Sequence, residues 1–266
     1  MNLSHRTHTA GPLLEARNLS KSFGGIHAVK GVSFQVDSGD IVGLIGPNGA
    51  GKTTCFNLMT GFYRPTAGKV FVRGQDVTNA APHEMAGRGV VRTFQKTNVL
   101  GPLSVLENVL AGHFLSTRKG LLSTFFPGKA VRETERAAKD NARRIVDLVG
   151  LGKRAGVPAH QLSCGDLRLL EVGIALAAKP AVLLLDEPAA GLNNREAKDL
   201  GAILEALRDD EVESILIVEH NMSLVMDISD RVVVMNFGEK LAEGLPEDVK
   251  RNPDVISAYL GKGREH

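Results

Sequence analysis

The chain has 266 residues, of which 43% are hydrophobic, and a formal net charge of +2. This length allows one large domain or a core with an attached subdomain, and the near-neutral charge argues against the basic surface of a nucleic-acid-binding protein. The two cysteines, Cys55 and Cys164, lie far apart and outside any Cys-x-x-Cys motif. They argue against a disulfide framework or zinc site and fit a reducing compartment.

We expect no signal peptide at the start of the sequence. Residues 1–11 are basic at the start but lack the apolar segment of a signal peptide, and we expect them to form a flexible tail. We interpret His5 and His8 as residues of that tail rather than as metal ligands. No apolar run in the chain approaches the roughly 20 residues that a membrane-spanning helix needs.

Two kinds of strand are predicted. Short alternating segments with Gly and Asp turns (LLEARNLSKSF, HAVKGVSFQVDSGD, GKVFVRGQDV) favour an antiparallel sheet attached to a core. Runs that are apolar throughout favour strands buried on both faces of a parallel sheet. These runs are IVGLI (41–45), AVLLL (181–185), SILIV (214–218) and RVVVM (231–235). Helical patterns lie between the apolar strands, as in an α/β fold.

The middle of the chain is predicted to be helical. Residues 103–160 contain no convincing strand, whereas SVLENVLAGHFL and AVRETERAAKDNARRIVDLVGL have helical spacing. We therefore expect one domain over residues 12–262. Its parts are a core with the antiparallel β subdomain in 12–95 and 161–250, a helical subdomain in 96–160 and a C-terminal helix in 251–262.

The segment GPNGAGKTT (46–54) matches the P-loop pattern Gly-x-x-x-x-Gly-Lys-Thr between a strand and a helix. Its glycines let backbone N–H groups turn inward, so that these groups and the helix N-terminus form a cradle for phosphate. Lys52 is expected to reach the β- and γ-phosphates, and the Thr53 hydroxyl to bind magnesium. The alternative of a Gly-rich turn before an ordinary helix is disfavoured by this context.

Two acidic residues end the apolar strand of AVLLLDEP (181–188), which we expect next to the P-loop strand. Asp186 is expected to hold magnesium, through water, and Glu187 to face the attacking water. His220 follows another apolar strand, and we expect it to point at the γ-phosphate because carboxyl ends of parallel strands share one edge. Hydrolysis of ATP or GTP is the predicted chemistry.

These residues give a resemblance that covers about residues 12–262. The chain resembles the ATP-binding subunit of ABC transporters, with GPNGAGKTT, VRTFQ, LSCGDLRLLEVGIAL, LLLDEPAAGLN and VEHNM in family order. The fold implied is a P-loop ABC-type α/β domain with an antiparallel β subdomain and an inserted helical subdomain. The cofactors implied are ATP and Mg²⁺.

The resemblance also implies roles for residues that the patterns alone leave open. Phe23 matches the aromatic residue that stacks on adenine, Gln95 contacts magnesium where the helical subdomain joins the core, and Ser163 clamps ATP bound by a second subunit. The nucleotide-binding set is Phe23, Gly46, Pro47, Asn48, Gly49, Ala50, Gly51, Lys52, Thr53, Thr54, Ser163 and Gly165. The catalytic set is Gln95, Glu187 and His220, and the metal set is Thr53, Gln95 and Asp186.

Within LSCGDLR (162–168), Cys164 and Asp166 depart from the family's Ser-Gly-Gly-Gln run. A cysteine is tolerable there if φ is negative and strained if it is positive. A carboxylate 4 Å from phosphate is repelled by about 4 kcal/mol at an effective dielectric of 20. In the family, however, this residue points toward the ribose. We therefore interpret the segment as a functional phosphate clamp whose strength differs from that of the family's usual run.

VRTFQ, LSVLENVLAG and the ending VISAYLG look most like the branched-chain amino acid importer group. This likeness implies a second ATPase subunit, identical or different, arranged head to tail. It also implies membrane permease subunits with an indirect solute-binding protein, and a peripheral location on the cytoplasmic face of the inner membrane. A groove that follows Gln95 is expected to receive a short cytoplasmic helix of the permease.

Other functions remain open at this stage. Urea, amide and aromatic-acid importers and lipopolysaccharide-type exporters have similar ATPases, and soluble ABC proteins act without a permease. The single cassette and near-neutral charge disfavour a nucleic-acid role, and Glu187 and His220 disfavour a non-hydrolytic subunit. Residues 116–131 carry apolar side chains beside basic ones, which fits either a contact with permease or lipid or a self-packed surface loop.

Overall fold

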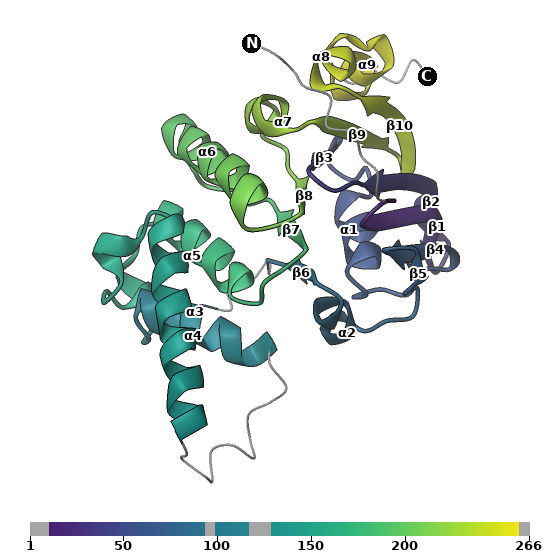
Figure 1. The fold of residues 1–266 in the computed structure, drawn as a ribbon. Helices are drawn as coiled ribbons and strands as arrows, with labels where there is room; N and C mark the ends of the chain where they lie inside the picture. Colours follow the sequence, from purple (N-terminus) through teal and green to yellow (C-terminus); the bar gives the residue numbers. More distant parts are fainter. Residues whose placement is uncertain (1–10, 94–98, 117–128, 261–266) are drawn as a thin grey trace.

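The computed structural model describes residues 11–93, 99–116 and 129–260. Figure 1 shows two parts: a β-rich part that holds both sheets, and a group of helices beside it. Gln95, most of the 1–11 tail and residues 117–128 of the apolar and basic segment lie outside the described residues. Within the described ranges, no helix has the length and apolar composition needed to span a membrane.

The first sheet is antiparallel, as the alternating segments predict. Its strand order is β2-β1-β4-β5. The strands are β1 (Leu14–Phe23), β2 (Ile26–Val36), β4 (Ala67–Val72) and β5 (Gln75–Asp76). Buried residues alternate with more exposed ones along β1 and β4, because one face of this sheet packs on the core.

The second sheet has the order β10-β9-β3-β8-β7-β6. Its strands are β3 (Ile41–Ile45), β6 (Val90–Arg92), β7 (Val182–Asp186), β8 (Ser214–Val218), β9 (Arg231–Asn236) and β10 (Glu239–Gly244). Strands β6, β7, β8, β3 and β9 run parallel, and β10 pairs antiparallel with β9. Strands β3, β7 and β8 are buried along their whole length, as their apolar sequences predict.

The order of the central strands corrects one expectation. The strand of Asp186 was expected next to the P-loop strand, but β8 lies between β3 and β7. The apolar sequence of each strand shows that it is central, and it does not show which neighbours it pairs with. The prediction of adjacency was therefore wrong.

Helices cover both faces of the parallel sheet. Helix α1 (Lys52–Met59) packs between the two sheets, while α6 (Asn194–Asp210) and α7 (Met222–Ile228) cover the opposite face. The short helix α2 (Pro82–Gly87) precedes β6.

The helical group lies beside the sheet in Figure 1. It contains α3 (Val105–Ser116), α4 (Lys129–Leu148), the 3₁₀ turns η2 (Gly152–Arg154) and η3 (Ala159–Gln161), and α5 (Cys164–Leu176). Helix α5 packs on α3 and α4. The helical group therefore includes α5, whereas the helical subdomain was expected to end at residue 160.

The end of the described chain forms two helices, whereas one helix was expected from residue 251 to residue 262. Helix α8 (Pro246–Arg251) stops at Asn252, and α9 (Pro253–Leu260) starts with a proline, which has no N–H for a continuous helix. Val249 and Val255 pack these helices against β3 and β9.

A strained residue follows β7. Glu187 has φ 49°, a left-handed conformation that is unfavourable for a residue with a Cβ atom. A hydrogen bond from the Glu187 N–H to the Val218 carbonyl oxygen, 2.8 Å long, holds the chain in this turn. Such strain is typical of functional sites.

This backbone conformation predicts an unusual order of stability. Because glycine adopts positive φ without a steric cost, we expect Glu187→Gly to be more stable than Glu187→Ala by about 1 kcal/mol. Glu205, exposed in the middle of α6, is the matched control, since glycine in a helix interior is less stable than alanine by about 1 kcal/mol. Denaturant unfolding of the four variants measures both differences. Equal stability of the two variants at position 187 would contradict the assigned strain.

Candidate nucleotide-binding site

The P-loop turns between β3 and α1 with little space around two of its glycines. A Cβ atom at Gly46 would lie 2.1 Å from the Met235 carbonyl oxygen, and one at Gly51 would lie 2.3 Å from the Ala28 carbonyl oxygen. Both residues have positive φ, 150° and 97°. The glycine requirement therefore comes from close backbone contacts with β2 and β9 as well as from the turn itself.

Lys52 begins α1 and folds back over the loop. Its ammonium donates hydrogen bonds to the carbonyl oxygens of Gly46, at 2.7 Å, and Pro47, at 3.0 Å. Burial lowers the pKa of Lys52, while the nearby Glu187 carboxylate raises it. The arrangement holds a cation at the mouth of the phosphate cradle.

A cavity of about 510 Å³ opens over this loop, within the size range of small-molecule sites. It brings together most of the predicted P-loop residues and Glu187. Its walls are Ile26, His27, Ala28, Lys30, Asn48, Gly49, Ala50, Gly51, Lys52, Thr53, Thr54, Glu187, Phe237 and Gly238. Gly46 and Pro47 are not among its walls, but their carbonyl oxygens accept the hydrogen bonds of Lys52, which is one of them.

Asp186 is a buried carboxylate at the end of β7. Its side chain is 0% exposed, and in the described part of the chain neither carboxylate oxygen has a hydrogen-bond partner. The Arg92 guanidinium lies 3.7 Å from one of them. Burial raises the pKa of Asp186 to about 6. Arg92 opposes the shift, and Glu187 and Glu219 add to it. A carboxylate in this state is suited to bind a hard cation such as Mg²⁺.

Glu219 is a residue that the sequence analysis missed. It is fully buried, and its side chain accepts hydrogen bonds from the N–H groups of Ala189 at 2.6 Å, His220 at 2.9 Å and Asn221 at 3.1 Å. It thereby ties the segment after Glu187 to the turn after β8. The signal in the sequence is an acidic residue directly after an apolar strand, which also fits an ordinary strand end.

The structure does not bring His220 and Phe23 into the walls of the cavity. The His220 side chain is 58% exposed and lies 3.7 Å from Glu219. Phe23 is 44% exposed and packs edge-to-face on Tyr63, with ring centroids 5.3 Å apart. Ile26, in the strand that follows Phe23, lines the cavity instead.

The LSCGDLR segment forms the start of α5, away from the P-loop cavity. Ser163 caps the helix, accepting a hydrogen bond from the Asp166 N–H. Cys164 is helical and is not among the described non-glycine residues with positive φ, so it is tolerated there. A Cβ atom at Gly165 would lie 3.2 Å from the Glu196 carboxylate, so a larger residue here would have to displace that side chain, and the backbone φ of Gly165 does not itself demand glycine.

The C-terminal helix reaches the P-loop. Burial raises the pKa of the Tyr259 phenol to about 12, while a hydrogen bond from the Gly46 backbone lowers it. Tyr259 of α9 therefore lies near Gly46, the first residue of the loop, a proximity that the sequence did not predict.

The environment of Asp186 predicts a pH dependence. A carboxyl group whose pKa rises from 3.8 to about 6 on folding binds more protons in the folded state, so stability is lost as the pH rises through this window. Relative to Asp186→Asn, we expect the nucleotide-free wild type to lose up to about 3 kcal/mol of unfolding free energy between pH 4 and pH 7. Denaturant unfolding at several pH values measures this loss. Asp199→Asn, which removes an exposed carboxylate on α6, is the control, and parallel pH profiles for wild type and Asp186→Asn would contradict the assignment.

Comparison with known proteins identifies the arrangement. The ABC transporter family model matches residues 29–190, and a model of branched-chain amino acid ATP-binding cassette transporters matches residues 239–265. Two branched-chain amino acid transport ATP-binding proteins, BraF of Pseudomonas aeruginosa and LivG of Escherichia coli, are each 43% identical over 251 residues. Each match covers 94% of this chain and 98% of the relative.

Solved structures agree with the sequence matches. A nucleotide-free ATP-binding cassette of an ABC transporter superposes with a TM-score of 0.82 at 34% identity, covering 95% of this chain and 100% of the other. The ADP conformation of such a cassette gives a TM-score of 0.82 at 33% identity, with the same coverage. The predicted fold class is confirmed, and the chain belongs to the ABC transporter ATP-binding family, whose cassettes are ATPases.

Proposed function

We propose that this chain hydrolyses ATP with Mg²⁺ to power an importer of branched-chain amino acids or related small polar solutes. The observation that carries the proposal is the joining of the P-loop, Lys52 and Glu187 in one cavity, with the buried Asp186 beside it. The residues present fit a magnesium ion, because the Asp186 carboxylate lacks hydrogen bonds in the described structure and Thr53 stands at the start of α1.

The proposed roles follow from these positions. The P-loop N–H groups and Lys52 hold the phosphates, and Glu187, which faces the same cavity, orients and deprotonates the attacking water. Thr53 and Asp186 hold Mg²⁺, which neutralises charge on the phosphates when bound. Gln95, outside the described residues, is proposed to contact the ion.

Two proposed roles require movement or a second molecule. His220 is exposed at the same sheet edge, and its imidazole is proposed to turn toward the γ-phosphate on binding. Phe23 lies on the strand that leads to Ile26 and is proposed to stack on adenine as the site fills. Ser163 and Gly165 are proposed to contact ATP bound by a second ABC ATPase subunit.

The transported solute is proposed from the relatives. BraF and LivG are named as high-affinity branched-chain amino acid transport proteins, and the match at residues 239–265 is to a family with the same name. These two observations favour branched-chain amino acids over the urea, amide, aromatic-acid and exporter alternatives. We propose a peripheral location on the cytoplasmic face of the membrane, beneath permease subunits fed by a solute-binding protein.

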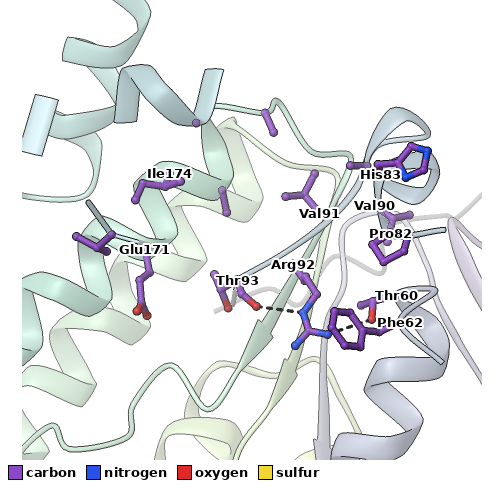
Figure 2. A pocket seen from close by; sticks show the side chains of 15 residues that line it. Thr60, Phe62, Pro82, His83, Val90, Val91, Arg92, Thr93, Glu171 and Ile174 are labelled. Carbon is purple, nitrogen blue, oxygen red and sulfur yellow. Dashed lines mark hydrogen bonds between the residues drawn. The ribbon is translucent and has the colours of Figure 1, made fainter. Parts of the chain in front are cut away.

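A groove between the β-rich part and the helical group is the proposed permease site. Its volume is about 430 Å³, and Figure 2 shows Phe62, Pro82 and His83 on one side with Glu171 and Ile174 on the other. Glu171 has a carboxylate oxygen that is buried and lacks a hydrogen-bond partner among the described residues, and burial raises its pKa. We propose that a short cytoplasmic helix fills the groove with apolar side chains and offers Glu171 a hydrogen-bond donor.

The assignment of the catalytic base gives a first functional prediction. We expect Glu187→Gln to bind ATP as the wild type does and to lose at least about 100-fold in turnover, because general-base catalysis contributes about 10²–10⁴-fold. Lys52→Ala should weaken binding itself, because its ammonium no longer neutralises phosphate charge. Nucleotide titration and steady-state hydrolysis, in preparations free of contaminating ATPase, separate the two effects. Turnover of Glu187→Gln equal to that of wild type would disprove the assignment.

The groove gives a second prediction, on coupling. Phe62 is 58% exposed in the groove, whereas Leu245 is 61% exposed before α8 and lies outside the groove. We expect Phe62→Ala to weaken permease binding about tenfold, because truncating an aromatic side chain at the centre of an interface costs on the order of 1 kcal/mol or more.

The coupling test compares uptake of labelled leucine in cells with basal ATPase activity of the purified chain. Phe62→Ala should lose uptake and keep ATPase activity, and Leu245→Ala should keep both. If uptake and ATPase activity always fall together, the groove is not the coupling site. Uptake of urea, amides or aromatic acids in place of leucine would favour the alternative importers.

A further inference from the structure

The hydroxyl of Ser163 is fully engaged within its own helical turn. Its Oγ donates to Asp166 Oδ2 over 2.6 Å and accepts from the Asp166 N–H over 3.2 Å. A serine hydroxyl has one hydrogen to donate. The Asp166 carboxylate therefore competes directly with any phosphate for that hydrogen.

Asp166 is itself paired with a residue that precedes it in the chain, before η3. The same oxygen, Oδ2, contacts the Arg154 guanidinium at the end of η2. The Asp166 side chain is 16% exposed and that of Arg154 is 50% exposed. One carboxylate oxygen thus accepts the hydrogen bond from the Ser163 hydroxyl and also contacts a guanidinium that solvent can reach.

We propose that Arg154 is a positioning residue of the ATP clamp, which neutralises Asp166 and draws its carboxylate away from Ser163 when phosphate arrives. The inference rests on the proposed function, in which Ser163 contacts ATP held by a second subunit. It explains how an acidic residue is compatible with a phosphate-binding turn. Without Arg154, an uncompensated carboxylate would keep the serine hydrogen and repel the incoming phosphate.

A purely structural role for the pair is the competing explanation. Arg154 joins η2 to the start of α5, and this link alone would stabilise the helical group. In that case, loss of Arg154 would lower the thermal unfolding temperature and leave the ATP requirement of the clamp unchanged. If Arg154 instead acts by neutralising Asp166, loss of Arg154 should change the ATP concentration that the clamp requires, and this change should disappear when Asp166 is also replaced by a neutral residue.

The experiment measures ATP-dependent pairing of the full-length chain carrying Glu187→Gln, by sedimentation over a range of Mg²⁺–ATP concentrations. We expect Arg154→Gln to raise the ATP concentration for half-maximal pairing roughly fivefold, the size of one like-charge repulsion near 4 Å in water. Added salt should reduce the difference, because exposed charges are screened. Arg154→Lys, which keeps the charge, should retain most of the pairing.

Neutralising Asp166 gives the decisive comparison. The double variant Arg154→Gln with Asp166→Asn should pair as Asp166→Asn does alone. Arg144→Gln, which removes an arginine–carboxylate contact between α4 and Glu211 at the end of α6, is the matched control and should leave ATP dependence unchanged. In the hydrolysing chain, Arg154→Gln should raise KM for ATP with little change in kcat.

The outcomes distinguish failure of the head-to-tail site from failure of the role of Arg154. If the Glu187→Gln chain does not pair with itself at any ATP concentration, a head-to-tail site between two copies of this chain fails, and this inference fails with it, whereas ATP hydrolysis with a different ATPase subunit stands. If it pairs, and Arg154→Gln has an unchanged ATP dependence or is not rescued by Asp166→Asn, the role of Arg154 is overturned while the proposed function stands.

Discussion

The register of strand β8 between its two neighbours is the constraint on which the site depends. Val218 pairs with Leu44 of β3 on one side and with Asp186 of β7 on the other. Its carbonyl oxygen also accepts the hydrogen bond that holds Glu187 in its left-handed turn. Three segments far apart in the chain therefore end at one level of the sheet. A shift of β8 by one residue would reverse the side-chain faces and separate them.

Two buried carboxylates at this sheet edge, those of Glu219 and Asp186, have different surroundings. The Glu219 carboxylate accepts hydrogen bonds from three backbone N–H groups, and these bonds hold two loops together. Asp186 lacks hydrogen bonds within the described residues, and Arg92 approaches only to 3.7 Å. Burial of an incompletely paired carboxylate is unfavourable, so its free energy falls when a cation arrives. Glu219 thus serves the structure, whereas Asp186 is the carboxylate that we propose for the metal ion.

The sequence predicted those features that depend on local pattern. The strands 41–45 and 214–218 were predicted to the residue, because an apolar run buried on both faces has clear ends. The order of the strands was not predicted correctly, since the apolar composition of a strand carries no information about which strands pair with it. The role of Glu219 was also hidden, because it depends on the N–H of Ala189, 30 residues away. The proximity of Tyr259 to Gly46 involves residues far apart in the chain and is equally absent from the local pattern.

The two halves of the proposed ATP clamp belong to different packing units. Lys52 starts a helix enclosed between the two sheets, whereas Ser163 starts a helix packed on α3 and α4. The cavity over Lys52 is open at its rim, where Ile26 and Phe237 are 72% and 77% exposed. Exposed apolar groups beside a phosphate cradle favour closure by another surface, because closure removes them from water. A second subunit that places its own equivalent of the LSCGDLR segment over the cavity would supply this surface. The charge balance of Asp166 would then act on the partner's nucleotide rather than on this chain's own.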